Sequence, residues 1–221
     1  DAYEMEEYCL LEKLFGAESL KGNFRLESVL SRPTVERLEQ RLKSQSVPCI
    51  VHIAGHTIAT ESMSTLLWFD GSGQAKTVGY DQVVEAFSSA LKHRAPSQPL
   101  DFVFLNGCKT LELGRLLIGC GVPYVLCWET SVSGGACHTL AKRFYRALRE
   151  QYLFCEAFRE ACCLWISDGF DVGDPESSDH GRGVPMILWN DLKGVNASWT
   201  KESGVSGNIS AVEISQSGWS R

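Results

Sequence analysis

Two short apolar segments of the chain each end in a chemically reactive side chain. Residues 50–56 read IVHIAGH and end at His56, whereas residues 102–108 read FVFLNGC and end at Cys108. Short apolar runs bounded by glycine are typical of buried strands, and in open α/β sheets ligands bind where parallel strands end. If these two strands are neighbours, an imidazole and a thiol meet at one edge of the sheet, as in a Cys/His nucleophile pair.

The order of the other segments favours an α/β domain with a mostly parallel sheet sandwiched by helices. Predicted strands alternate with predicted helices, and right-handed crossovers make such strands parallel neighbours. The predicted strands are residues 24–30, 47–54, 102–105, 123–128 and 184–189. The predicted helices are residues 3–15, 34–42, 80–91, 110–118, 136–150 and 154–166. Residues 65–69 and 75–78 flank an Asp-Gly-Ser-Gly turn, which predicts a small antiparallel flap near the active edge.

We expect one domain over residues 20–195. Because the chain begins with Asp rather than Met, residues 1–19 are predicted to be a helix or linker that follows a preceding region. Residues 196–221 form a Ser/Gly-rich tail, which either stays outside the sheet or adds an edge strand. Two polar segments, residues 57–64 and 167–183, are predicted loops.

Composition excludes several classes of function. The chain carries 27 acidic against 21 basic residues, a net charge of -6, so it has no basic footprint for nucleic acid. No run approaches the roughly 18 apolar residues that a membrane helix needs, so no membrane contact is expected. Finger-like Cys/His spacing is missing as well, and neither a metal nor another cofactor is expected.

Nine cysteines are scattered along the chain without a C-x-x-C pair. An odd count in a chain large enough to bury a core predicts reduced thiols and a cytoplasmic location. Five of the cysteines lie in or beside apolar runs, where a free thiol behaves as a small core residue. These five are Cys49, Cys120, Cys127, Cys155 and Cys162.

Cys108 stands where a predicted strand passes into a predicted helix. Gly107 permits a sharp turn there, Thr110 is available as the helix N-cap, and the positive end of a helix favours the reactive thiolate. The alternative is a buried structural thiol at a tight turn. His52 lies inside its apolar run, so we interpret it as a core residue, or alternatively as a group that orients the site from behind.

Longer strings around these residues resemble the CHAT family of the caspase/gingipain/separase superfamily of cysteine peptidases. The resemblance runs through VHIAGHT and then LDFVFLNGCKTLELGRLLIGCGVPYVLCWETSVSGGACHTLAKRFYRAL. The order and spacing of these strings are more specific than either motif alone. The resemblance implies a caspase-like fold and a cysteine endopeptidase that cleaves protein or peptide substrates.

Residue by residue, the resemblance implies Cys108 as nucleophile and His56 as general base and acid. The backbone N–H groups of Cys108 and Thr57 would hold the oxyanion. Family members usually have glycine after the histidine, and this chain has Thr57. Relatives also follow the tryptophan with Pro, a small residue and Asp, where an acid receives a basic P1 side chain; here Glu129 follows Trp128.

P1 specificity therefore does not carry over from the family. Glu61 and Glu129 are candidates for a pocket that binds a basic side chain, and the alternative is that both are solvated surface charges. Two other functions stay open: a catalytically silent adaptor or scaffold, and an acyl- or amide-transferring enzyme. We expect a peptidase to be activated by a partner or by another domain of the same protein.

Overall fold

The computed structural model describes residues 9, 11–14, 30, 33–44, 49–59, 64–70, 72, 74–94, 100–170 and 183–190. The chain divides into two compact units. One unit contains Leu30–Glu129 and Pro185–Thr200, and the other contains Thr130–Val184. The first unit holds both sheets and every described candidate residue.

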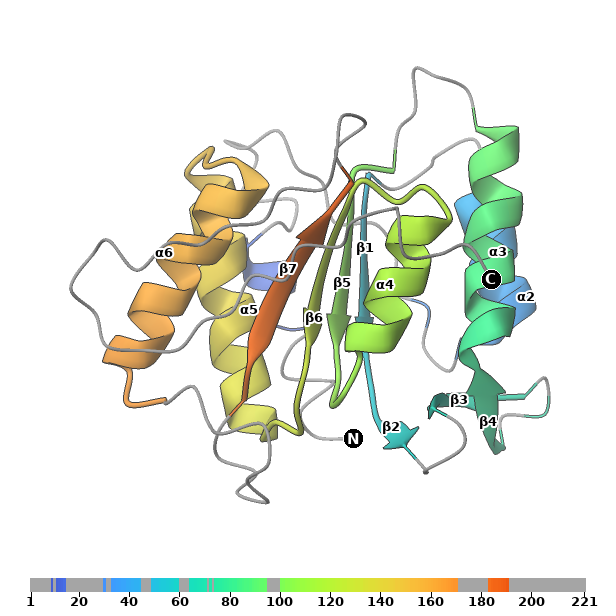
Figure 1. The fold of residues 1–221 in the computed structure, drawn as a ribbon, viewed down its shortest axis with the longest axis horizontal. Coiled ribbons are helices and arrows are strands. Elements are labelled where there is room, and N and C mark those ends of the chain that lie inside the picture. The colour runs from blue at the N-terminus through green and yellow to red at the C-terminus, as the bar shows by residue number, and fades with distance from the viewer. Residues whose placement is uncertain are drawn as a thin grey trace. The chain divides into compact units, whose positions relative to one another are not determined.

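The main sheet has four strands in the order β1-β5-β6-β7 (Figure 1). Their bounds are β1 Ile50–Ala54, β5 Phe102–Asn106, β6 Tyr124–Trp128 and β7 Pro185–Trp189. The β1–β5 and β5–β6 pairs are parallel, and the β6–β7 pair is antiparallel. The predicted mostly parallel sheet is therefore confirmed, and its last strand runs against the others.

Burial differs between the two strands that carry the reactive residues. All five residues of β5 are buried, as a continuous apolar run predicts for a central strand of a parallel sheet. All five residues of β1 are only half-buried, because β1 is the outermost strand of this sheet among the described residues. The expectation of a buried strand is therefore wrong for β1, which is half-buried along its length.

Three helices belong to the same unit: α2 (Val35–Leu42), α3 (Tyr80–His93) and α4 (Leu111–Gly119). Thr34 caps α2, since its hydroxyl accepts a hydrogen bond from the Arg37 N–H at 3.2 Å. Helix α4 packs on β6 and β7, and α2 packs on α3.

A second, three-stranded antiparallel sheet lies beyond the carboxyl end of β1 (Figure 1). Its strands are β2 (Thr57–Ala59), β3 (Ser64–Phe69) and β4 (Ala75–Gly79), and the β3–β4 pair confirms the predicted flap. Strand β2 falls in a segment that the sequence predicted as loop, so that prediction is wrong. Three residues carry too little pattern to reveal a strand that is formed by pairing with β3.

In the other unit, helices α5 (Gly134–Arg149) and α6 (Phe154–Ser167) pack against each other, and both confirm their predictions. The buried Trp165 indole donates a hydrogen bond to the Ala136 carbonyl at 3.0 Å. Arg143 and Asp168 form an ion pair at 2.8 Å, and the Arg143 hydrogen bond lowers the pKa of the Asp168 carboxyl.

The predicted strand 24–29, the segment 171–182 and the tail 196–221 lie outside the described residues. All nine cysteines are free; Cys127 and Cys162 are buried as predicted, whereas Cys49 and Cys155 are exposed, which contradicts their assignment to the core. No helix in the described part of the chain is long and apolar enough to span a membrane.

Candidate active site

Strands β1 and β5 bring His56 and Cys108 to the same edge of the main sheet. The parallel register pairs Ile53 with Leu105 and Ala54 with Asn106. The Gly55 N–H continues this ladder by donating to the Asn106 carbonyl at 3.4 Å. Two residues beyond the last pair on each strand are His56 and Cys108, which therefore occupy equivalent positions on adjacent chains. The His56 side chain is exposed and Cys108 is half-buried.

The two chains touch at glycines just before these residues. A Cβ atom added to Gly107 would lie 2.5 Å from the Gly55 carbonyl oxygen, closer than such atoms can approach. The chain turns at residues 107–109 as the sequence predicted, but Gly107 does not adopt a positive φ, so glycine is required here for the close approach to Gly55. The two chains therefore approach too closely at Gly55 and Gly107 to admit a side chain at position 107.

Thr57 connects the two chains directly through its side chain. Its hydroxyl donates a hydrogen bond to the Cys108 carbonyl. In the β2–β3 ladder the Leu67 N–H donates to the His56 carbonyl at 2.9 Å, which makes Thr57 and Leu66 a non-hydrogen-bonded pair. The Thr57 N–H therefore makes no hydrogen bond to β3 and points away from that strand.

We define residues 107–110 as the nucleophile turn. Within this turn, Lys109 adopts a left-handed backbone conformation. Its φ is 52°, a conformation that costs a non-glycine residue roughly 1–2 kcal/mol. The turn ends at Thr110, the N-cap position of α4, but the Thr110 hydroxyl makes no capping hydrogen bond. It donates instead toward the carbonyls of Gly107 and Leu105, at 3.1 and 3.3 Å.

The nucleophile turn is part of a buried hydrogen-bond network that the sequence did not predict. The Thr110 hydroxyl also accepts a hydrogen bond from the Trp128 N–H at 3.0 Å, so it links the nucleophile turn to the end of β6. The Trp128 indole donates to the Asn106 side-chain oxygen at 2.9 Å. All three residues are buried, so each polar group in the network needs the partner that it has. The sequence signal that could have revealed this network is Asn106, a polar residue at the end of a buried strand.

Tyr80 reaches the same turn from the start of α3. Its phenol donates to the Lys109 carbonyl at 3.4 Å. Burial raises the pKa of Tyr80 to about 12, so the phenol keeps its proton and remains a donor at neutral pH.

His52 packs against Phe104, the residue opposite it in the β1–β5 register. Their ring centroids lie 4.7 Å apart and the rings are tilted by 59°. The ring is half-buried, as the interpretation of His52 as a core residue expects. It shares the strand face of His56 in an extended chain, because the two residues are separated by an even number of positions.

Only one of the two glutamates predicted for substrate binding can be placed. Glu129 directly follows β6, is half-buried and, if the β5–β6 register is continued, lies beside Gly107 at the same sheet edge. Glu61 lies outside the described residues.

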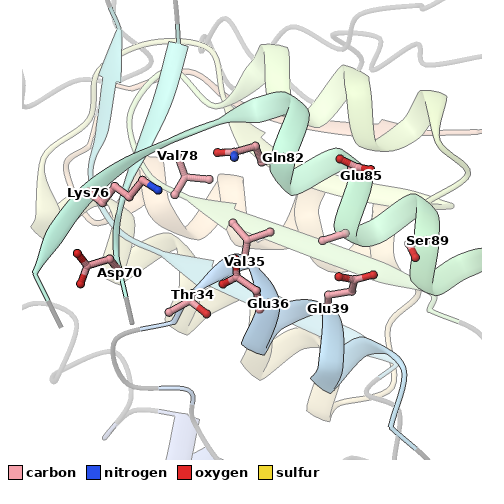
Figure 2. A pocket seen from close by; sticks show the side chains of 11 residues that line it. Thr34, Val35, Glu36, Glu39, Asp70, Lys76, Val78, Gln82, Glu85 and Ser89 are labelled. Atoms are coloured by element: carbon pink, nitrogen blue, oxygen red, sulfur yellow. The ribbon is translucent and has the colours of Figure 1, made fainter. Parts of the chain in front are cut away.

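A hollow of about 280 Å³ lies elsewhere in this unit, between α2, α3 and the β3–β4 hairpin (Figure 2). Its charged lining is mostly acidic, with Lys76 as the one basic side chain among the lining residues. The acidic residues are Glu36, Glu39, Asp70 and Glu85. Neither His56 nor Cys108 lines it, so this hollow is separate from the candidate active site.

The described residues contain no group of three or more His, Cys, Asp or Glu side chains that could hold a metal ion. The chemistry that the placed groups can perform is nucleophilic attack by a thiol, with an imidazole nearby to carry the proton.

The mostly parallel sheet with flanking helices and a small antiparallel sheet defines a caspase-like α/β fold. A family model for the CHAT domain matches residues 2–168, most of the chain, so the chain belongs to the CHAT domain family, which is related to caspase-like cysteine peptidases. The search of curated proteins found no match.

Proposed function

We propose that this domain is a cysteine endopeptidase that cleaves protein or peptide substrates with a Cys108/His56 dyad. The observation that carries the proposal is the β1–β5 register, whose last pair, Ala54 and Asn106, lies two residues before His56 on one chain and Cys108 on the other. The hydrogen bond from Thr57 to Cys108 supports it, because it joins the two loops beyond the strand ends.

In the proposed reaction His56 takes the Cys108 thiol proton while the sulfur attacks the scissile carbonyl carbon. The proton then passes to the leaving amine as the carbon–nitrogen bond breaks, which gives a thioester. His56 next removes a proton from water, whose oxygen attacks the thioester and releases the acid and the thiol. The N–H groups of Cys108 and Thr57 would stabilise the oxyanion, and the β2–β3 ladder leaves the latter group available.

Substrate selection and regulation are part of the proposal. Glu129 is placed at the carboxyl edge of the sheet, where it could receive a basic P1 side chain, with Glu61 as a second candidate. Activation would come from a partner or from another domain of the same protein. Nine free cysteines support a cytoplasmic location for the protein, since reduced thiols persist there.

The test is labelling of the full protein with a peptidyl acyloxymethyl ketone, followed by a peptide-library cleavage screen. We expect the reagent to modify Cys108, and Cys108→Ala to reduce cleavage at least about 10³-fold without loss of folding, since the side chain is half-exposed. His56→Ala should prevent labelling. Cys163→Ala removes another half-exposed thiol and is the matched control, for which we expect wild-type cleavage.

The main alternative is a catalytically silent CHAT module that acts as an adaptor, which the presence of Thr57 in place of the family's glycine favours. Cleavage retained in Cys108→Ala would contradict the proposal, and a wild-type Cys108 that reacts no faster than Cys163 would favour the adaptor. An amide product formed from an added amine, in place of the acid, would identify acyl transfer.

A further inference from the structure

Two hydroxyl groups hold consecutive carbonyls of the nucleophile turn. Thr57 donates to the carbonyl of Cys108, and Tyr80 donates to the carbonyl of Lys109. Neither donor belongs to the turn or to β5: Thr57 begins β2, and Tyr80 is the first residue after β4. The turn is therefore held from outside, by residues at two ends of the small sheet.

The turn needs such support because its conformation is unfavourable. Lys109 has the left-handed φ described above, and the first turn of α4 begins only at Leu111. A strained backbone persists only where its surroundings fix it. Hydrogen bonds to both carbonyls around Lys109 fix the two peptide groups on either side of its Cα atom.

The two donors are connected to each other through β3. Leu66 on β3 pairs with Thr57 on one side and with Val78 on the other, and Val78 lies two residues before Tyr80. Tyr80 is itself 5% exposed, so its ring is fixed by packing. A shift of the small sheet would therefore alter both hydrogen bonds together.

We infer that the Thr57 hydroxyl and the Tyr80 phenol are positioning residues that orient the Cys108–Lys109 backbone, and that through them the small sheet sets the reactivity of Cys108. This inference rests on the proposed function. It concerns the side chain of Thr57 and adds Tyr80, to which the dyad mechanism gives no part. Small displacements of a reacting group cost large factors in rate, which makes such support consequential.

The test uses variants that remove one hydroxyl with little change in shape: Thr57→Val, Tyr80→Phe and the double variant. Thr57→Ser keeps the hydroxyl and is the rescue variant. Thr65→Val is the matched control, because the Thr65 hydroxyl also donates to a carbonyl, that of Ile58 at 3.2 Å, but within the small sheet.

The first measurement is inactivation by the peptidyl acyloxymethyl ketone, with kinact and KI determined separately. We expect Thr57→Val to lower kinact roughly ten-fold and Tyr80→Phe roughly three-fold, with KI within about two-fold of wild type. Thr57→Ser and Thr65→Val should stay within about two-fold of wild type. The double variant should differ from the product of the single effects, because the donors are coupled.

The second measurement is hydrogen exchange of the nucleophile turn in the same variants, which needs no catalytic activity. Exchange of the Lys109 and Thr110 amides should rise at least about five-fold in Thr57→Val and in Tyr80→Phe, but not in Thr57→Ser or Thr65→Val. Unchanged kinact and exchange in both hydroxyl-deleted variants would overturn the inference, as would a Thr57→Ser variant as defective as Thr57→Val. If wild type is not inactivated at all, the proposed function fails, and the exchange result alone decides whether the two hydroxyls hold the turn.

Discussion

β1 and β5 are neighbours with the same direction, yet the chain around Cys108 and the chain around His56 are supported differently. β5 is completely buried, and the turn that follows it is linked to β6 by the hydrogen bond from the Trp128 N–H to the Thr110 hydroxyl. β1 is half-buried along its length, and His56 beyond it is exposed. The chain that carries the sulfur thus follows a fully buried strand, whereas the chain that carries the imidazole follows a strand nearer the surface. Substitutions on the two strands should therefore separate stability from activity.

Truncation of one side chain on each strand measures this contrast, and it should give the largest effect. Phe104 is 0% exposed on β5, so Phe104→Ala should lower the free energy of unfolding by about 3–5 kcal/mol. Ile53 is half-buried on β1, and Ile53→Ala should cost about 1 kcal/mol. Chemical denaturation of both variants gives the comparison. Equal losses would show that the two strands are equally supported.

The contact between the strands can be broken at Gly107. Gly107→Ala places a Cβ against the Gly55 carbonyl, where only backbone can yield, so we expect a loss of about 2–3 kcal/mol and separation of the two strand ends. Gly135→Ala is the matched control in the first turn of α5: apart from its chain neighbours and the backbone of its own helix, no atom lies within 4 Å of the added Cβ, so we expect no loss of stability. Thermal unfolding monitors both. A neutral Gly107→Ala would contradict the close approach.

The support of the nucleophile turn by the core can be tested at Thr110. Thr110→Val keeps the shape but leaves the buried Trp128 N–H without its acceptor, which should cost about 1–3 kcal/mol. Thr110→Ser retains the hydroxyl and should recover most of that loss. Urea denaturation with tryptophan fluorescence measures both variants. If valine is tolerated as well as serine, the network does not stabilise the turn.

The smallest effect should be on the pH dependence of stability, through the phenol of Tyr80 that donates to the nucleophile turn. The folded pKa of Tyr80 is raised by burial to about 12 from an ordinary value of 10. Its contribution to stability is therefore fully present below pH 10 and is lost as the pH rises from 10 to about 12. Over this range wild type should lose stability more steeply than Tyr80→Phe. Parallel pH profiles of unfolding would show that the phenol titrates alike in both states.

Local sequence pattern was enough to predict the elements whose burial follows from the spacing of their own apolar residues. The apolar run of β5 and the helical spacing in α5 and α6 gave the right element type, and the apolar segments correctly placed His56 and Cys108 just beyond strand ends. The resemblance carried by the longer strings named the family that the family match then showed.

Features that depend on distant partners could not be predicted in the same way. β2 exists because β3 pairs with it, and the need for glycine at 107 arises from a contact with Gly55. The hydroxyl of Thr110 was expected at a helix end, but carbonyls of its own turn and the Trp128 N–H compete for it successfully. The exposure of β1 likewise depends on which strands flank it, and a continuous apolar run does not reveal that.

The contact between Gly107 and the Gly55 carbonyl limits how substitution can change the spacing of the two chains. Since Gly107 already has the smallest possible side chain, substitution at this position can push the two chains apart but cannot bring them closer. A change of residue at position 107 is therefore not a route to a closer pair of strand ends.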